Sequence, residues 1–118
     1  MAGIAIPLFW GVNMFTINGR IWRIKYATPG SRNLRRSDGS ETVGVTNLKD
    51  GVIYLSTALS GAFLRKVLIH ELTHAAMFSY GIVVDIDTEE LICDLIASHG
   101  EEVIRLADNI FRQIKRIA

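Results

Sequence analysis

The chain has 118 residues, of which 49% are apolar and 21% are charged, and its formal net charge is +1. That size and apolar content suit one domain with a buried core, and the near-neutral balance excludes a general attraction to strongly acidic or basic partners. The single cysteine, Cys93, excludes an intrachain disulfide. We expect one domain over 1–118, strand-rich over 1–57 and helical over 58–118.

The first segment with a pattern is apolar and spans residues 4–10. It lacks a basic leader and is too short to cross a membrane, so we expect a cytoplasmic protein with no membrane contact. Residues 4–27 read as strands. Asn18-Gly19 lies between two β-rich runs, which is the strongest short signal for a hairpin.

Residues 28–41 are rich in Pro, Gly, Ser, Asn and Arg and are expected to form a loop. A nucleic-acid interface is an alternative interpretation of this part of the chain. Its basic residues are Arg20, Arg23, Lys25, Arg32, Arg35 and Arg36. The arginines of the loop have no aromatic residues between them on which bases would stack, so a solvated loop is favoured.

Two further strands are expected over Val43–Thr46 and Val52–Ser56, joined by a turn at Asp50-Gly51. The second strand directly precedes the helical half of the chain. We therefore expect Val52–Ser56 at the edge of the sheet, where a peptide could be added as an extra strand.

Three helical segments follow. The first is expected over 60–80, with Ser60 as N-cap and Gly81 ending it in a left-handed turn. The second starts near Asp87 and continues to Ala97, and His99-Gly100 is expected to break or kink it. The last, 101–117, is amphipathic.

The most informative motif is His70-Glu71-Leu72-Thr73-His74, set in an almost continuous apolar run. Residues four apart share one face of a helix, so the two imidazoles can aim at one metal ion. A helix that is apolar all round is normally buried, and buried polar groups need partners. We therefore expect His70 and His74 to bind one Zn²⁺ per chain, with Glu71 as a general base acting on a metal-activated water.

Catalytic zinc needs a third protein ligand. Glu90 and Asp94 are four apart and share a helix face, so Glu90 could bind the metal while Asp94 accepts a hydrogen bond from a ligand histidine. The alternatives are that Glu90 caps the helix in a capping box with Asp87, or that Glu89 is the ligand. Cys93 is expected to be a small buried hydrophobe. The donor set would also accept Fe, Co or Mn.

H-E-L-T-H followed by E-L-I-C-D resembles the gluzincin class of zinc metallopeptidases, whose pattern is H-E-x-x-H and then E-x-x-x-D. Within that class it is similar to the compact mini-gluzincins and the phage- and mobile-element-borne ImmA/IrrE-like peptidases. The resemblance covers residues 52–98. It implies ligands His70, His74 and Glu90, base Glu71 and a supporting Asp94. No motif places a residue that stabilises the oxyanion; Tyr54 and Tyr80 are the candidates.

The resulting expectation is an α+β, zincin-like domain: a small twisted antiparallel sheet of about four strands, packed on two to three helices with the H-E-x-x-H helix at the centre. Its expected activity is zinc-dependent hydrolysis of protein or peptide substrates. Two alternatives remain: a latent or non-catalytic, metal-stabilised interaction protein, and a DNA-associated protein that uses the basic region 20–36. The sequence leaves the oligomeric state and the natural substrate open.

Overall fold

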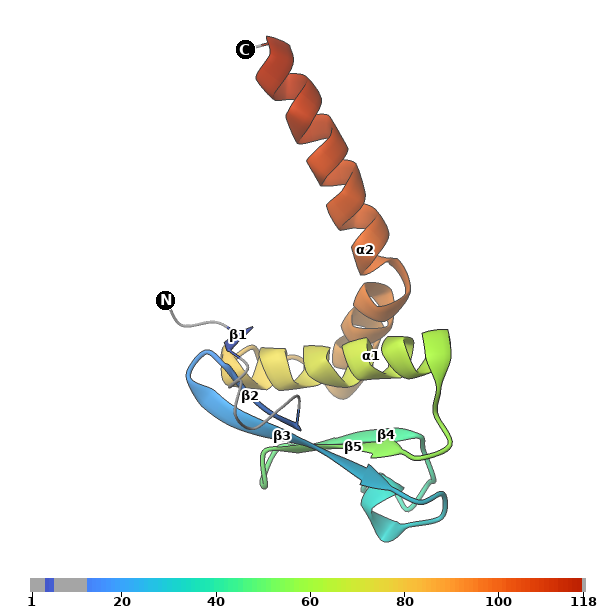
Figure 1. Ribbon diagram of the computed structural model, residues 1–118. Helices are drawn as coiled ribbons and strands as arrows, with labels where there is room; N and C mark the ends of the chain where they lie inside the picture. Colours follow the sequence, from blue (N-terminus) through green and yellow to red (C-terminus); the bar gives the residue numbers. More distant parts are fainter. Residues whose placement is uncertain (1–3, 6–12, 118) are drawn as a thin grey trace.

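The computed structural model describes residues 4–5 and 13–117 and has an α+β architecture (Figure 1). Its strands are β1 (Ile4–Ala5), β2 (Met14–Ile17), β3 (Arg20–Ala27), β4 (Gly44–Asn47) and β5 (Val52–Ser56). A 3-10 turn, η2 (Arg32–Leu34), precedes β4, and the helices are α1 (Gly61–Ser79) and α2 (Ile86–Ile117). The expected strand residues 6–12 lie outside the described part. No helix in the described part is long and apolar enough to cross a membrane.

The strands form one five-stranded sheet in the order β1-β2-β3-β5-β4. The β2–β3 turn is the expected Asn18-Gly19 hairpin, and both residues have positive φ, 50° and 76°, as a type I′ turn requires. The expectation of an antiparallel sheet of about four strands is wrong in one pairing, because β3 and β5 are parallel. After β3, the segment 28–43 leads the chain to β4, which is not the direct neighbour of β3 in the sheet. Strand β5 then lies between β3 and β4.

This topology also corrects the expected edge of the sheet. Strand β5 lies between β3 and β4, so Val52–Ser56 is interior and β4 forms the edge. Most of β5 is buried, and Ile53 and Leu55 are among the most buried side chains of the core. The short, half-buried β4 is therefore the strand that runs beside α1 with one side unpaired.

Helix α1 is the central layer. One side packs on the sheet through a core that includes Trp22, Ile53, Val67 and Ala75, and α2 packs against it from the other side (Figure 1). This two-sided burial explains why the α1 sequence is apolar nearly all round. The helix ends as expected at Gly81, which has a φ of +70° and donates its backbone N–H to the Phe78 carbonyl.

The second and third expected helices are one continuous helix, α2, of 32 residues. Figure 1 shows that α2 changes direction partway and that its last part projects away from the rest of the molecule. The alternative interpretation, a capping box of Asp87 and Glu90, is wrong. Asp85 caps the helix instead: its carboxylate accepts from the backbone N–H and the hydroxyl of Thr88, and the hydroxyl bond is the main cause of the lowered pKa of Asp85. Glu90 is thereby free of any capping role.

Candidate metal centre

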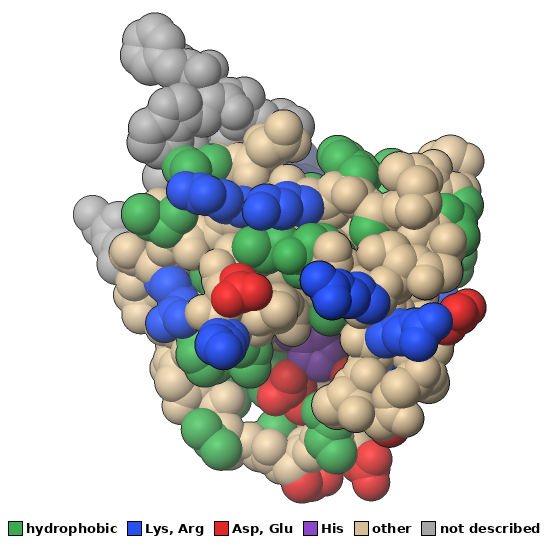
Figure 2. Space-filling model, turned by 90° about the horizontal axis from the view of Figure 1, so that it is seen from below, with side chains coloured by type: hydrophobic (Ala, Val, Ile, Leu, Met, Phe, Trp, Pro, Cys, Tyr) green, Lys and Arg blue, Asp and Glu red, His purple; other side chains and the backbone are tan. Residues whose placement is uncertain are grey.

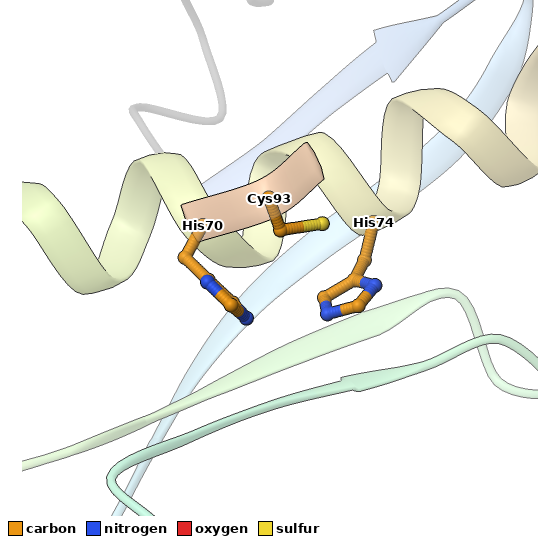
Figure 3. A group of neighbouring side chains, drawn as sticks. All are labelled: His70, His74 and Cys93. Carbon is orange, nitrogen blue, oxygen red and sulfur yellow. The ribbon is translucent and has the colours of Figure 1, made fainter. Parts of the chain in front are cut away.

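His70 and His74 lie one turn apart on α1, and Figure 3 shows both imidazoles on the same side of this helix, next to Cys93 of α2. Their ring centroids are 4.9 Å apart. Both side chains are mostly buried, with exposed fractions of 16% and 10%. The short connection between the helices turns the chain back, so that four acidic or thiol side chains of α2 face the two imidazoles.

The Nδ1 atom of each histidine is held by a carboxylate. His70 Nδ1 is 2.9 Å from Asp94 Oδ1, and His74 Nδ1 is 2.5 Å from Glu89 Oε2. A proton on each Nδ1 satisfies both contacts and leaves the Nε2 lone pairs free. Glu89, the alternative ligand from the sequence, thus contacts the far nitrogen of a histidine in the way that carboxylates support metal-bound imidazoles.

Glu90 contacts the other nitrogen of both rings. Its two carboxylate oxygens lie 3.1 Å from His70 Nε2 and 3.0 Å from His74 Nε2. A carboxylate only accepts, so each of these contacts calls for a proton on Nε2 or for a cation; with the protons on the Nδ1 atoms, a cation bound between the three groups would take that place. Bonds of about 2.0–2.1 Å in a tetrahedral site place ligand atoms roughly 3.3 Å apart, which is close to the separations found here.

Cys93 offers a second choice of third donor. Its side chain is fully buried behind the imidazoles, and one donor atom from each of His70, His74 and Cys93 falls within 4.8 Å of the others (Figure 3). These three residues could hold a metal ion. Glu90 instead places one carboxylate oxygen near each ring nitrogen, at 3.1 Å and 3.0 Å. Burial, and next the negative charge of Glu90, raises the pKa of the Cys93 thiol from 9.0 to about 12 in the metal-free protein, and a bound cation would lower it again.

Glu71 lies beside the histidines but turns toward the sheet. Its Oε2 is 3.9 Å from His70 Nε2, and its Oε1 accepts a hydrogen bond of 2.8 Å from the Thr46 hydroxyl of β4. The residue is 7% exposed. Gly44 permits this close approach, because a Cβ there would lie 3.1 Å from Glu71 Cγ. One oxygen of Glu71 is therefore held by Thr46, while the other lies near the ring nitrogen of His70.

The centre opens into a cavity of about 600 Å³. His70, Glu71, His74 and Glu90 line one side, and β4 and the loop around Arg35–Asp38 line the other. Figure 2 shows a histidine at the bottom of a hollow, with acidic side chains beside it and basic ones across from it. Of α2, only residues 86–90 contribute to the lining, so the described part of this helix leaves the centre open.

Tyr54 and Tyr80, the candidates for stabilising the oxyanion, do not line this cavity. Tyr54 lines a separate cavity of about 480 Å³, and Tyr80 is the exposed residue that ends α1. The side chains that do line the metal cavity and were not anticipated there are Thr46, Arg35 and Arg36. No motif or helical spacing connects them to the histidines, because they come from the sheet edge and its loop.

The basic residues considered for nucleic-acid binding do not form one continuous patch. Arg20 stacks over Phe78 of α1 at 4.3 Å, whereas Arg23 and Lys25 line the second cavity. Arg35 and Arg36 line the metal cavity. On the face in Figure 2, basic side chains are interrupted by apolar and acidic ones. This distribution does not favour tracking of a phosphate backbone.

Comparisons with protein-family models, with curated proteins and with solved structures find no match to this chain.

Proposed function

We propose that this protein is a zinc-dependent, gluzincin-like metallopeptidase with a zincin-like core. His70, His74 and Glu90 are the proposed metal ligands. The observation that supports this most directly is the arrangement of the two imidazoles: each Nδ1 meets a carboxylate, while both Nε2 atoms face the same Glu90 carboxylate. With both Nδ1 atoms protonated, one divalent cation between the three groups would join the two Nε2 lone pairs to the Glu90 carboxylate.

When bound, zinc supplies Lewis-acid polarisation of a peptide carbonyl and lowers the pKa of a coordinated water. The chain's own residues do the rest. Glu71 accepts a proton from the attacking water and delivers it to the leaving amine nitrogen. Thr46 holds one carboxylate oxygen of Glu71, so that the other stays directed toward the histidines. Asp94 and Glu89 fix the tautomers and the orientations of the imidazoles.

The test uses the purified chain loaded with Zn²⁺ and an unfolded protein substrate such as casein. We expect cleavage by the unmodified chain, none by Glu71→Gln, and about one zinc per chain in both. Glu102→Gln, the same change at an exposed position on α2, is the matched control and should cleave normally. Cleavage by Glu71→Gln at the unmodified rate would contradict the assigned base, and absence of zinc from the unmodified chain would overturn the proposal.

The third ligand is tested separately by cobalt substitution. A thiolate bound to Co²⁺ adds a charge-transfer absorption that a carboxylate does not. We expect no such band, and we expect Glu90→Gln to lower metal affinity far more than Cys93→Ser. A band that is present in the unmodified protein and lost in Cys93→Ser would assign the third position to Cys93.

A metal-stabilised interaction protein is a second candidate, favoured by the exposed apolar face of α2. Six side chains on this face are each more than half exposed: Val103, Ile104, Leu106, Ile110, Phe111 and Ile114. Burying them at roughly 60–120 Å² each, in two chains, approaches the total of about 1,000 Å² that a stable interface needs. Acidic residues begin this part of α2 and basic residues end it, so an antiparallel second copy is the complementary occupant.

Sedimentation equilibrium decides this second candidate. We expect dimers for the unmodified chain and monomers for Ile110→Asp, which puts a charge in the apolar face. The matched control, Asn109→Asp, adds the same charge on the polar face and should remain dimeric. A monomer at every concentration for the unmodified chain would refute self-association and leave the peptidase proposal untouched.

A further inference from the structure

The loop that faces the metal centre across the cavity is held in place by its own backbone. Leu34, at its start, is 2% exposed and anchors it to the core. The Thr42 N–H donates to the Leu34 carbonyl and the Arg36 N–H to the Ser40 carbonyl, each at 2.9 Å. Arg35 and Glu41 form an isolated antiparallel bridge. Arg35 and Arg36 therefore start from fixed backbone positions at the rim of the cavity.

The carboxylates that line the cavity are largely occupied by other partners. Glu71 accepts from Thr46, and Glu89 and Glu90 contact the histidines. Asp38, next to the arginines, accepts from the backbone N–H and the hydroxyl of Ser40. Within residues 4–5 and 13–117, no ion pair of 4.0 Å or less involves either arginine. Arg35 and Arg36 thus both line the cavity without a direct ion pair to any residue that the structure describes, although the pKa of Asp38, lowered mainly by its hydrogen bonds with Ser40, is lowered further by the nearby charge of Arg36.

We propose that Arg35 and Arg36 form a binding site for a carboxylate of the peptide substrate. This inference rests on the proposed peptidase function and specifies its substrate class. A guanidinium presents a planar fork of N–H donors that matches a carboxylate, and two of them can hold both oxygens. The ligand chemistry is the same for an acidic side chain near the scissile bond and for the carboxylate at the end of the substrate chain.

The charge distribution across the cavity gives this site a direction. Asp87, Glu89 and Glu90 line the α2 side, whereas the loop side carries Arg35, Arg36 and one carboxylate, Asp38, so that two positive charges face one negative charge there. An anionic group is repelled by the first and attracted by the second. A peptide that carries one carboxylate would therefore enter with that group toward the loop, and its neighbouring backbone would lie between the loop and the metal centre, over Gly44–Thr46 of the edge strand.

The experiment compares alanine-rich, fluorescent decapeptides that contain one Glu or one Gln at each position in turn. Each peptide is made with a free C-terminal carboxylate and with an amide, so that the two sources of carboxylate are separated. Binding is measured by anisotropy with the zinc-loaded Glu71→Gln protein, and hydrolysis with the unmodified protein. The variants are Arg35→Gln, Arg36→Gln and their combination. Arg32→Gln removes the same charge from η2 outside the cavity lining and is the control.

We expect one carboxylate source to improve binding and kcat/KM by about tenfold to a hundredfold over its neutral counterpart, the range for a hydrogen bond to a charged group. The double variant should lose this preference, and Arg32→Gln should keep it. Hydrolysis without any charge preference would overturn the inference and leave the peptidase proposal standing. Charge-selective binding that depends on the arginines, without hydrolysis, would uphold the site and refute the peptidase. Equal binding of all peptides would also overturn the inference.

Discussion

Replacing Gly44 by alanine tests how closely the edge strand β4 and helix α1 must approach. The φ of this glycine lies outside the left-handed region, so the added methyl introduces no backbone strain. Its cost comes from space: the new Cβ would lie 2.8 Å from Val67 Cγ1 and 3.1 Å from Glu71 Cγ. A distance below 3.0 Å is not tolerated, so the Val67 side chain, β4 or α1 must move.

Overpacking of this kind costs about 1–3 kcal/mol. For a domain of this size, each kcal/mol lowers the melting temperature by about 4 °C, so Gly44→Ala should melt about 4–12 °C lower. The same methyl would lie 3.2 Å from Glu71 Oε2. Hydrolysis should therefore fall further than the loss of folded protein explains.

A double-mutant cycle with Val67→Ala identifies the cause. Val67→Ala alone removes two methyl groups from the core and should cost about 2 kcal/mol. It also removes the Val67 methyl group that the new Cβ would contact. The loss of unfolding free energy in the double variant should therefore be smaller than the sum of the two single losses by at least about 1 kcal/mol. The measurement is urea denaturation followed by circular dichroism. Additivity within about 0.5 kcal/mol, or an unchanged midpoint for Gly44→Ala, would refute this account.

Three other changes have expected outcomes. Asp94→Ala removes the acceptor for His70 Nδ1 and should weaken zinc binding by about tenfold, because this carboxylate is exposed; competition with a chelator measures it, and an unchanged affinity would contradict the supporting role. Trp22→Phe removes the 2.9 Å hydrogen bond from Trp22 Nε1 to Ser79 Oγ and part of a fully buried ring; we expect a loss of about 2 kcal/mol in urea denaturation, partly recovered by Ser79→Ala. The pKa of Cys93 is raised from 9.0 to about 12, so the unfolded chain loses the thiol proton at a lower pH than the folded chain. The free energy of unfolding of the metal-free protein should therefore decline as the pH rises from 9 toward 12. Cys93→Ala should not show this pH-dependent decline.

Features governed by neighbouring residues could be predicted from the sequence. The Asn18-Gly19 hairpin and the end of α1 at Gly81 each follow from a local backbone preference. The position of the histidines on one helix face follows from the helical repeat. The burial of α1 was expected from its apolar composition, whereas its packing between the sheet and α2 is seen only in the structure.

The sheet order could not be obtained in this way. Whether β4 or β5 lies at the edge depends on where the segment 28–43 delivers the chain, and no local signal encodes that. The beginning of α2 was ambiguous for a different reason, because Asp85 and Asp87 both precede Glu89 and Glu90. Only the contacts of Asp85 with Thr88 show which acidic residue caps the helix.

In the candidate centre, too, the residues with local spacing could be predicted and those brought together by the fold could not. The donors on α1 and α2 have helical spacing, so the sequence pointed to His70, His74, Glu90 and Asp94. Thr46 comes from a strand that is distant in sequence, and its hydroxyl reaches Glu71 only because of the fold. Like Thr46, Arg35 and Arg36 could not be placed from the sequence, because their position opposite the centre depends on how the loop folds back.

The two-layer contact of α1 couples metal affinity to helix docking. The imidazoles come from α1, which the sheet supports, whereas the carboxylates come from α2, which packs on α1. Because α2 already packs on α1, a cation bound between them would add to an existing contact. Its dissociation constant would then depend on helix packing as well as on coordination, and loosening the apolar contact between the helices would weaken metal binding with every ligand intact.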